Sequence, residues 1–189
     1  MDNIKKIHFG SLTVVLILSL LGCQQNVALS DYLNSKKDKE VFIEPEPSDW
    51  VKYSKPVREY MYHRTQAVIN NDINILWERY PKLKENIDLE KGINAEKNEV
   101  KTLKEGFDLL DANYDIESYE RIKVNAINDN EVIVLVHGSI VYLRNDFDES
   151  GGEYLMKVFL KQKNNHWNVV KTDEYTTSEY KEWLQEKNE

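Results

Sequence analysis

The 189-residue sequence is poor in cysteine, proline, glycine and net positive charge, and each scarcity excludes a class of protein. One cysteine forms no internal disulfide, so the fold must be stabilised by packing. Seven glycines leave no glycine-rich phosphate loop. With 25 basic against 33 acidic residues, the chain lacks the basic surface that binds nucleic acid or anionic lipid. We therefore expect no nucleic-acid partner.

Long apolar runs are also missing, because the longest falls short of the roughly 20 residues that span a bilayer. Residues 12–23 read Leu-Thr-Val-Val-Leu-Ile-Leu-Ser-Leu-Leu-Gly-Cys, and Lys5 and Lys6 precede them. A basic start, a short apolar stretch and a small residue are typical of a secretory signal peptide. The final Leu-Leu-Gly-Cys resembles the lipobox of bacterial lipoproteins.

That resemblance implies that residues 1–22 are removed and that Cys23 becomes the first residue, carrying a diacylglycerol and a palmitate-type chain. Two or more acyl chains anchor a protein persistently in a bilayer, whereas one chain is marginal. We therefore expect a domain held on the extracytoplasmic side of a bacterial cell membrane. The alternatives are an ordinary signal peptide with a stray cysteine and an uncleaved anchor. Loss of residues 1–22 leaves 23 basic and 32 acidic residues, a net charge of −9.

Residues 23–53 have the composition of a tether. They include the polar run at 35–40 and Pro45 and Pro47, which favour extended backbone. A domain is predicted over residues 54–189. Its first helix is expected to begin near Ser54, with Pro56 in the first turn. Helical periodicity predicts a second helix from about Ile73 to Tyr80 and a third over residues 94–110.

After Asp115 the apolar period changes from 3.6 to 2, which predicts four antiparallel strands in a meander. The run from Val132 to Val136 is apolar throughout, which indicates a central strand buried on both faces. The last strand is expected to end at Tyr175. Thr176 and Glu179 then fit the capping box of a helix over residues 177–185.

Three helices followed by four strands indicate an α+β fold. The first helix, the Asn71-Asp72 break, the segment from Ile73 to Pro81 and the final hairpin with Trp167 together resemble the nuclear transport factor 2-like superfamily, also called SnoaL-like or cystatin-like. The resemblance implies helices packed into a curved antiparallel sheet, a cone with an apolar cavity. The helix over residues 177–185 is an addition to that pattern.

Enzymes of this superfamily use Asp, His or Tyr side chains inside the cone, so the resemblance points to a candidate pocket. We predict its residues to be His137, Tyr142, Asp173, Tyr175 and Trp77. The pattern leaves open which face of each strand is concave. A loop at residues 146–151 has the spacing that opens some calcium sites, but Lys157 stands where the closing carboxylate belongs. No metal, cofactor or catalytic residue is therefore predicted.

The sequence favours a non-enzymatic binding module that recognises a small apolar ligand or an envelope protein. An isomerase or dehydratase that uses polar residues of the cone is the alternative interpretation. A third is a structural protein that dimerises through its sheet. The predicted lipid contact of Cys23 is common to all three.

Overall fold

The computed structural model describes residues 40–88, 92–106, 109–116 and 122–187. The elements below all belong to one compact unit, Val41–Glu189. The predicted signal peptide and Cys23 lie outside the described residues.

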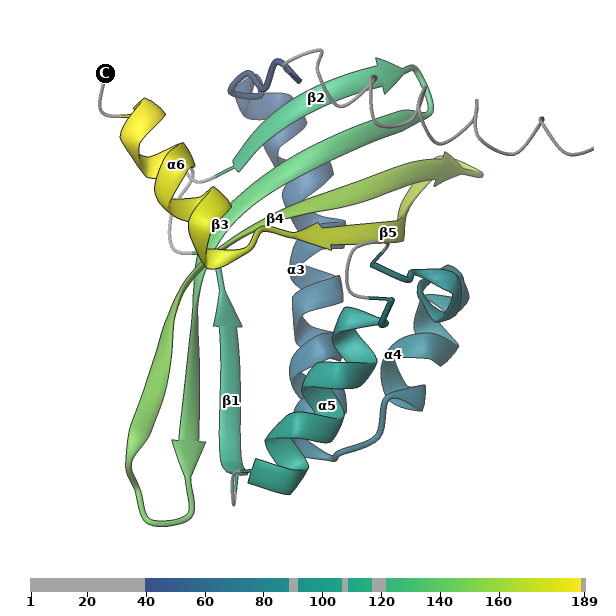
Figure 1. The fold of residues 1–189 in the computed structure, drawn as a ribbon. Helices are drawn as coiled ribbons and strands as arrows, with labels where there is room; N and C mark the ends of the chain where they lie inside the picture. Colours follow the sequence, from purple (N-terminus) through teal and green to yellow (C-terminus); the bar gives the residue numbers. More distant parts are fainter. Residues whose placement is uncertain (1–39, 89–91, 107–108, 117–121, 188–189) are drawn as a thin grey trace, which may run out of the picture. The chain divides into compact units, whose positions relative to one another are not determined.

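The long helix α3 spans Pro47–Ile69 and packs along the sheet (Figure 1). It begins seven residues before the predicted start at Ser54. Pro47 occupies its first turn, where a missing N–H leaves no bond unmade, so the helix starts there and Pro56 falls inside it. The buried side chains recur every three or four residues, as one helix face requires. They are Tyr53, Ser54, Pro56, Val57, Tyr60, Met61, Arg64, Ala67 and Val68.

The other helices on this side of the sheet are short. α4 covers Asn74–Arg79, and the Asp72 carboxylate accepts a bond of 2.9 Å from the Asn74 N–H before it begins. A 3₁₀ turn, η1, follows at Pro81–Glu85. α5 spans Ala95–Gly106, so the helix predicted to reach residue 110 ends earlier, at the glycine.

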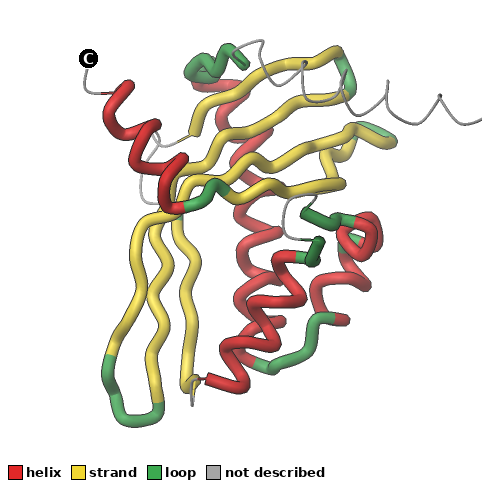
Figure 2. Tube along the Cα trace, viewed as in Figure 1, coloured by secondary structure: helices red, strands yellow, loops and turns green. Residues whose placement is uncertain are grey.

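Five strands follow in the described chain: β1 Leu109–Asp115, β2 Ile122–Asn128, β3 Glu131–Arg144, β4 Glu149–Lys163 and β5 His166–Glu174. β2 to β5 match the four predicted strands, whereas β1 was not predicted. All pairings are antiparallel. β2 pairs with the first half of β3 and β1 with the second half, and the sheet bends between these halves (Figure 2).

The predicted burial of the central strand on both faces is confirmed, because the side chains from Val132 to Val136 are at most 5% exposed. The even-numbered residues Val132, Val134 and Val136 belong to the core shared with α3. Alternation along the strand turns Ile133, Leu135 and His137 to the other face, called the outer face below. The even-numbered face is therefore the concave one.

The C-terminal helix α6 spans Thr177–Lys187 and packs on the outer face through Tyr180 and Trp183, which contact His137. Its predicted capping box is confirmed: the Thr176 N–H donates to the Glu179 carboxylate at 2.7 Å, and the Glu179 N–H donates to the Thr176 hydroxyl at 3.4 Å. Of the helices in the described ranges, none has the length and apolar character needed to cross a bilayer.

Candidate functional site

An ionic cluster around a buried arginine joins α3, α5 and β5 on the concave side of the sheet, and its Glu174 side chain is 40% exposed. The centre of the cluster is Arg64, whose side chain is 6% exposed. Nε donates to Glu99 Oε2 at 2.9 Å, and Nη2 donates to Glu174 Oε2 at 2.9 Å. The guanidinium also lies 4.8 Å from the centre of the Tyr114 ring. A buried guanidinium requires such partners, because an unpaired charge in the interior is strongly unfavourable.

Two tyrosines complete the coordination of Glu99. The Tyr142 hydroxyl donates to Glu99 Oε1 at 2.9 Å, the Tyr114 hydroxyl donates to the same oxygen, and the two hydroxyls lie 3.1 Å apart. Both oxygens of Glu99 are therefore occupied. We call Arg64, Glu99, Glu174, Tyr114 and Tyr142 the Arg64 cluster.

Burial decides the protonation of the phenols around this cluster. It raises the pKa of Tyr114 and Tyr142 above the ordinary value near 10, and the Glu99 carboxylate adds to the effect in both. Burial also raises the pKa of Tyr154, on the neighbouring strand β4. The phenols consequently stay neutral at physiological pH and act as hydrogen-bond donors rather than as bases.

A second buried carboxylate, Glu96, lies one helical turn before Glu99 on α5 and is 1% exposed. Its Oε1 accepts bonds from the Thr172 hydroxyl at 2.5 Å and from the Tyr60 hydroxyl at 3.2 Å. Its Oε2 has no hydrogen-bond partner in the described part of the chain. Glu96 is therefore a buried carboxylate whose hydrogen-bonding capacity the surrounding side chains satisfy only in part.

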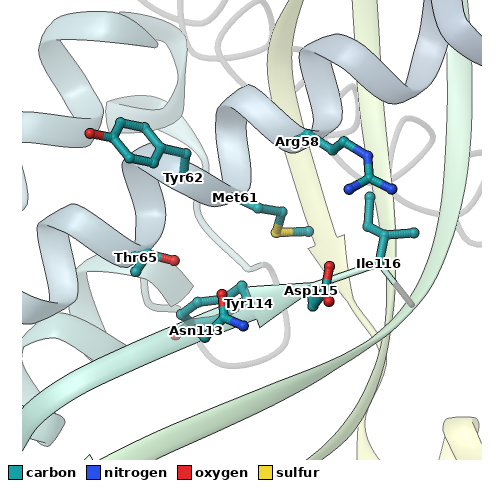
Figure 3. Close-up of a pocket in the computed structure, with 8 residues that line it drawn as sticks. All are labelled: Arg58, Met61, Tyr62, Thr65, Asn113, Tyr114, Asp115 and Ile116. Atoms are coloured by element: carbon teal, nitrogen blue, oxygen red, sulfur yellow. The ribbon is translucent and has the colours of Figure 1, made fainter. Parts of the chain in front are cut away.

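A cleft of about 190 Å³ opens on the surface between α3 and β1 (Figure 3). Its floor is apolar, because Met61, Tyr114 and Ile116 are buried. The remaining lining residues are more exposed: Arg58, Tyr62 and Thr65 on α3, and Asn113 and Asp115 on β1. Tyr114 belongs to both sites, because its ring forms part of the floor of the cleft and its hydroxyl donates to Glu99 in the Arg64 cluster.

The structure does not bring the five predicted pocket residues together. Tyr142 lies in the Arg64 cluster. His137 lies on the outer face, where its Nε2 is 2.9 Å from the Tyr180 hydroxyl and 3.1 Å from Glu153 Oε2. Asp173 pairs in register with Lys157, whose Nζ is 5.4 Å from the Tyr175 ring.

Because Asp173 lies one residue from the concave-facing Thr172 and Glu174, its side chain also points to the outer face. Trp77 lies on α4, half-buried, with its ring 5.9 Å from Lys84 Nζ. Among the described residues, no three His, Cys, Asp or Glu side chains are grouped to hold a metal ion.

The sequence prediction missed Arg64, Glu96, Glu99 and Glu174. Arg64 recurs at helical spacing with the apolar residues Met61 and Val68, and a cation in such an apolar stripe is a usable signal for a buried partner. Its carboxylate partners carry no such signal, because the sequence contains 33 acidic residues.

No protein-family model matches the sequence, and no curated protein matches it. Among solved structures the chain is similar to Aln2 from a Streptomyces species, with 9% identity over 74% of this chain and 98% of that one and a TM-score of 0.50. It is also similar to a protein from Catenulispora acidiphila, with 8% identity over 71% and 98% of the two chains and a TM-score of 0.50.

A nuclear transport factor 2-like superfamily protein from Salmonella enterica serovar Typhimurium matches with 10% identity over 68% of this chain and 92% of that one, at a TM-score of 0.42. Identities this low bear on the fold alone. The helices packed into a strongly curved antiparallel sheet form the cone-shaped nuclear transport factor 2-like fold, so the predicted α+β class is confirmed.

Proposed function

We propose that the protein is a lipid-anchored, non-enzymatic binding module that engages an envelope protein through the cleft between α3 and β1. The observation that carries the proposal is the size and lining of this cleft. Its volume of about 190 Å³ lies below the roughly 300 Å³ at which small-molecule pockets usually begin. A space of this size suits one or two side chains of a protein partner better than an entire small ligand.

The distribution of polarity in the cleft supports the same choice. An apolar floor with a polar, accessible rim is the arrangement found at the centres of protein interfaces. Tyr62 stands at this rim with 61% of its surface exposed. Exposed tyrosines frequently contribute much of the energy of an interface, because they combine a large apolar ring with a hydroxyl.

The interior favours binding over catalysis. Arg64 and Glu99, which have the chemistry of an active site, bond to each other and to neighbouring side chains. A group that serves as acid or base must reach a substrate and have a pKa near the working pH. Both oxygens of Glu99 already accept bonds from side chains of the protein, namely Arg64, Tyr114 and Tyr142.

The proposed function is tested by photo-crosslinking in the bacterial envelope. A photoreactive phenylalanine replaces Tyr62 in the cleft or, as control, Phe147 in the β3–β4 turn, whose side chain is 76% exposed. We expect the probe at residue 62 to give a discrete protein adduct that the probe at residue 147 does not give. Identical adduct patterns, or no protein adduct from residue 62, would contradict the proposal.

The proposed location rests on Cys23. We expect Cys23→Ala to abolish incorporation of labelled palmitate and either to release the domain or to leave an uncut precursor. The measurement is metabolic labelling followed by membrane fractionation. Unchanged labelling of the variant would show that Cys23 is not the residue to which the lipid is attached.

The isomerase or dehydratase activity is the second candidate, and Glu96 is the observation that favours it. A buried carboxyl whose Oε2 lacks a partner among the described residues resembles the base that such chemistry needs. Native mass spectrometry of the protein from its own host separates the candidates. A co-purified small molecule favours this activity or a ligand carrier, and a clean mass, monomeric or dimeric, favours a protein partner.

A further inference from the structure

We infer that the partner enters the cleft as an extended polypeptide segment that adds to the free edge of β1, with alternating apolar and basic side chains. This inference rests on the proposed function, because it names the chemistry of the partner that the same cleft accepts. Four observations support it: the position of β1 in the sheet, the direction of its backbone groups, the length of the cleft and the chemistry of the two strand faces.

Among the strands of the described ranges, β1 is an edge strand, because it stands at the end of the strand order and pairs there with β3 alone. Four consecutive residues, Asn113 to Ile116, line the cleft. Neighbouring residues of a strand point to opposite faces of the sheet. A cleft that contacts side chains on both faces of the strand must therefore run along the edge of the strand, where an added strand would lie.

The backbone of β1 turns hydrogen-bonding groups toward the cleft. The Ala112 N–H donates to the Asp111 side chain at 2.8 Å, which indicates that it points away from β3. Because the direction of backbone groups alternates along a strand, the N–H and C=O of Tyr114 point the same way. The Asp111 side chain thus occupies the outward-pointing N–H of Ala112. The part of the β1 edge that lies beside the cleft begins after Ala112.

The two walls of the cleft have matching lengths. Arg58 and Thr65 mark its ends on α3, and a rise of about 1.5 Å per residue separates them by roughly 10 Å. On the other wall the cleft runs from Asn113 on β1 to Ile116, the residue that follows the strand, and about 3.3 Å per residue again gives roughly 10 Å. Figure 3 shows Arg58 near Ile116 and Thr65 near Asn113, so α3 and β1 flank the cleft side by side. This length accommodates three or four extended residues.

The chemistry of the two faces of β1 specifies the side chains of the added strand. On the concave face, Met61, Tyr114 and Ile116 form the buried floor and favour apolar side chains. On the other face, Asp111, Asn113 and Asp115 are exposed. Opposite charges on directly paired strands stabilise the pairing, so basic side chains are favoured there. The net charge of −8 adds a general attraction for a basic segment.

The test uses full-length protein in detergent micelles and measures the fluorescence anisotropy of labelled hexapeptides. The probe is Lys-Phe-Lys-Leu-Lys-Val, and the matched control is Lys-Lys-Lys-Phe-Leu-Val, which has the same composition and charge without alternation. We expect the alternating peptide to bind at least about tenfold more tightly, because one face of it meets the floor and the other meets the carboxylates. Equal binding of the two peptides would overturn the inference.

Backbone pairing is tested with two N-methylated versions of the probe, one modified on the lysine amides and one on the apolar amides. In an added strand the amides that face β1 all have one parity. One version should therefore bind about tenfold or more weakly while the other retains its affinity, since several bonds are lost together. Retained affinity in both versions would exclude strand addition.

Variants of the protein locate the bound peptide. Thr65→Trp fills the cleft and Asp115→Lys reverses a charge on its edge, so each should weaken binding of the probe about tenfold or more. The controls are Thr102→Trp on α5 and Asp173→Lys on the outer face of β5, both at exposed positions. Equal effects of the variants and their controls would place the peptide elsewhere. If the photoprobe at residue 62 gives its protein adduct but the peptide tests fail, this inference alone is overturned. If the photoprobe gives no adduct, the proposed function itself is overturned.

Discussion

At the scale of the residue, the position of Arg64 determines the polar interior of the domain. It occupies the face of α3 that otherwise packs into the core, so its charge had to be matched by residues from other elements. Glu99 lies 35 positions away along the chain and Glu174 lies 110 positions away. Burial lowers the pKa of the guanidinium, but Glu99, Tyr60 and Glu174 raise it by more, so the net pKa lies well above the ordinary value.

We expect Arg64→Met to reduce the free energy of unfolding by about 3–5 kcal/mol, because it leaves Glu99 buried without its cation. The measurement is urea unfolding followed by circular dichroism. Arg79→Met is the matched control, since Arg79 pairs with Glu59 at the surface and its side chain is 46% exposed. This change should cost only about 0–1 kcal/mol. Similar losses in the two variants would contradict the structural role given to Arg64.

The buried tyrosines predict a loss of stability at alkaline pH. Within the described part of the chain, burial raises the pKa of Tyr60, Tyr80, Tyr114, Tyr142 and Tyr154. In the unfolded chain these phenols ionise near pH 10. Their contribution to stability is therefore complete below about pH 10 and is lost as the pH rises through the folded-state pKa values.

Above pH 10 each buried tyrosine should lower the free energy of unfolding by up to about 1.4 kcal/mol per pH unit. Absorbance at 295 nm, recorded with circular dichroism, checks this expectation. The absorbance of the buried tyrosinates should increase together with unfolding. Ionisation of all 11 tyrosines near pH 10 in a folded domain would contradict it.

At the scale of the element, β3 organises the sheet because it pairs with β1, β2 and β4. Gly138 lies between its two halves, and the absence of a side chain there permits a close approach of backbone. A Cβ atom at this position would overlap the Asp115 carbonyl oxygen and come within 2.6 Å of the Tyr154 hydroxyl. In this geometry, the close approach of β1 to β3 beside Tyr154 therefore relies on glycine at residue 138.

Gly138→Ala should destabilise the domain by about 1–3 kcal/mol or more, because the overlap with backbone forces the strands apart. Gly152→Ala on β4 is the control, since a Cβ atom there would meet nothing within 4 Å. The control should be neutral or slightly stabilising, because alanine reduces the entropy of the unfolded chain. Thermal unfolding of the two variants makes the comparison. A neutral Gly138→Ala would show that β1 tolerates displacement.

The elements also differ in how well periodicity predicted them. α4, α6 and the strands from β2 to β5 follow clear repeats, and their identification was correct. β1 was missed although Ala112, Tyr114 and Ile116 alternate with polar residues. β1 begins at Leu109, close in sequence to the end of α5 at Gly106, and in the sequence Phe107 and Leu110 continue the helical period of apolar residues. Where two periods overlap, local sequence does not decide between them, and pairing with β3 does.

At the scale of the whole molecule, the domain begins earlier than the tether composition suggested. The backbone of Ile43 bonds to that of Val124 in both directions, at 3.0 and 2.7 Å. Through this bridge the backbone at Ile43 pairs with β2, although Pro45 and Pro47 follow it closely in the sequence and the segment has no strand-like pattern of apolar residues. The compact unit accordingly starts at Val41.

A shortened chain that starts at Val41 should unfold cooperatively and be more stable than one that starts at Asp49. The difference should be about 1–3 kcal/mol, because the shorter chain lacks the two Ile43–Val124 bonds and the first turn of α3. Denaturant unfolding of both chains measures it. Equal stability would show that the bridge adds nothing, and a broad transition in the longer chain would contradict the domain boundary.

The sequence by itself determined the α+β class, the central strand and the type of most elements, because amphipathic periods of 3.6 and 2 are properties of local order along the chain. It also predicts the lipid anchor at Cys23, since a signal peptide is read as a linear motif. Only the tertiary structure decided which face of each strand is concave. Alternation places His137 and Tyr142 on opposite faces of β3, but it does not say which face is the interior one. The packing of α3 against Val132, Val134 and Val136 decides this. The Arg64 cluster and the cleft follow from that choice, because both join residues that meet only when the sheet closes around the helix.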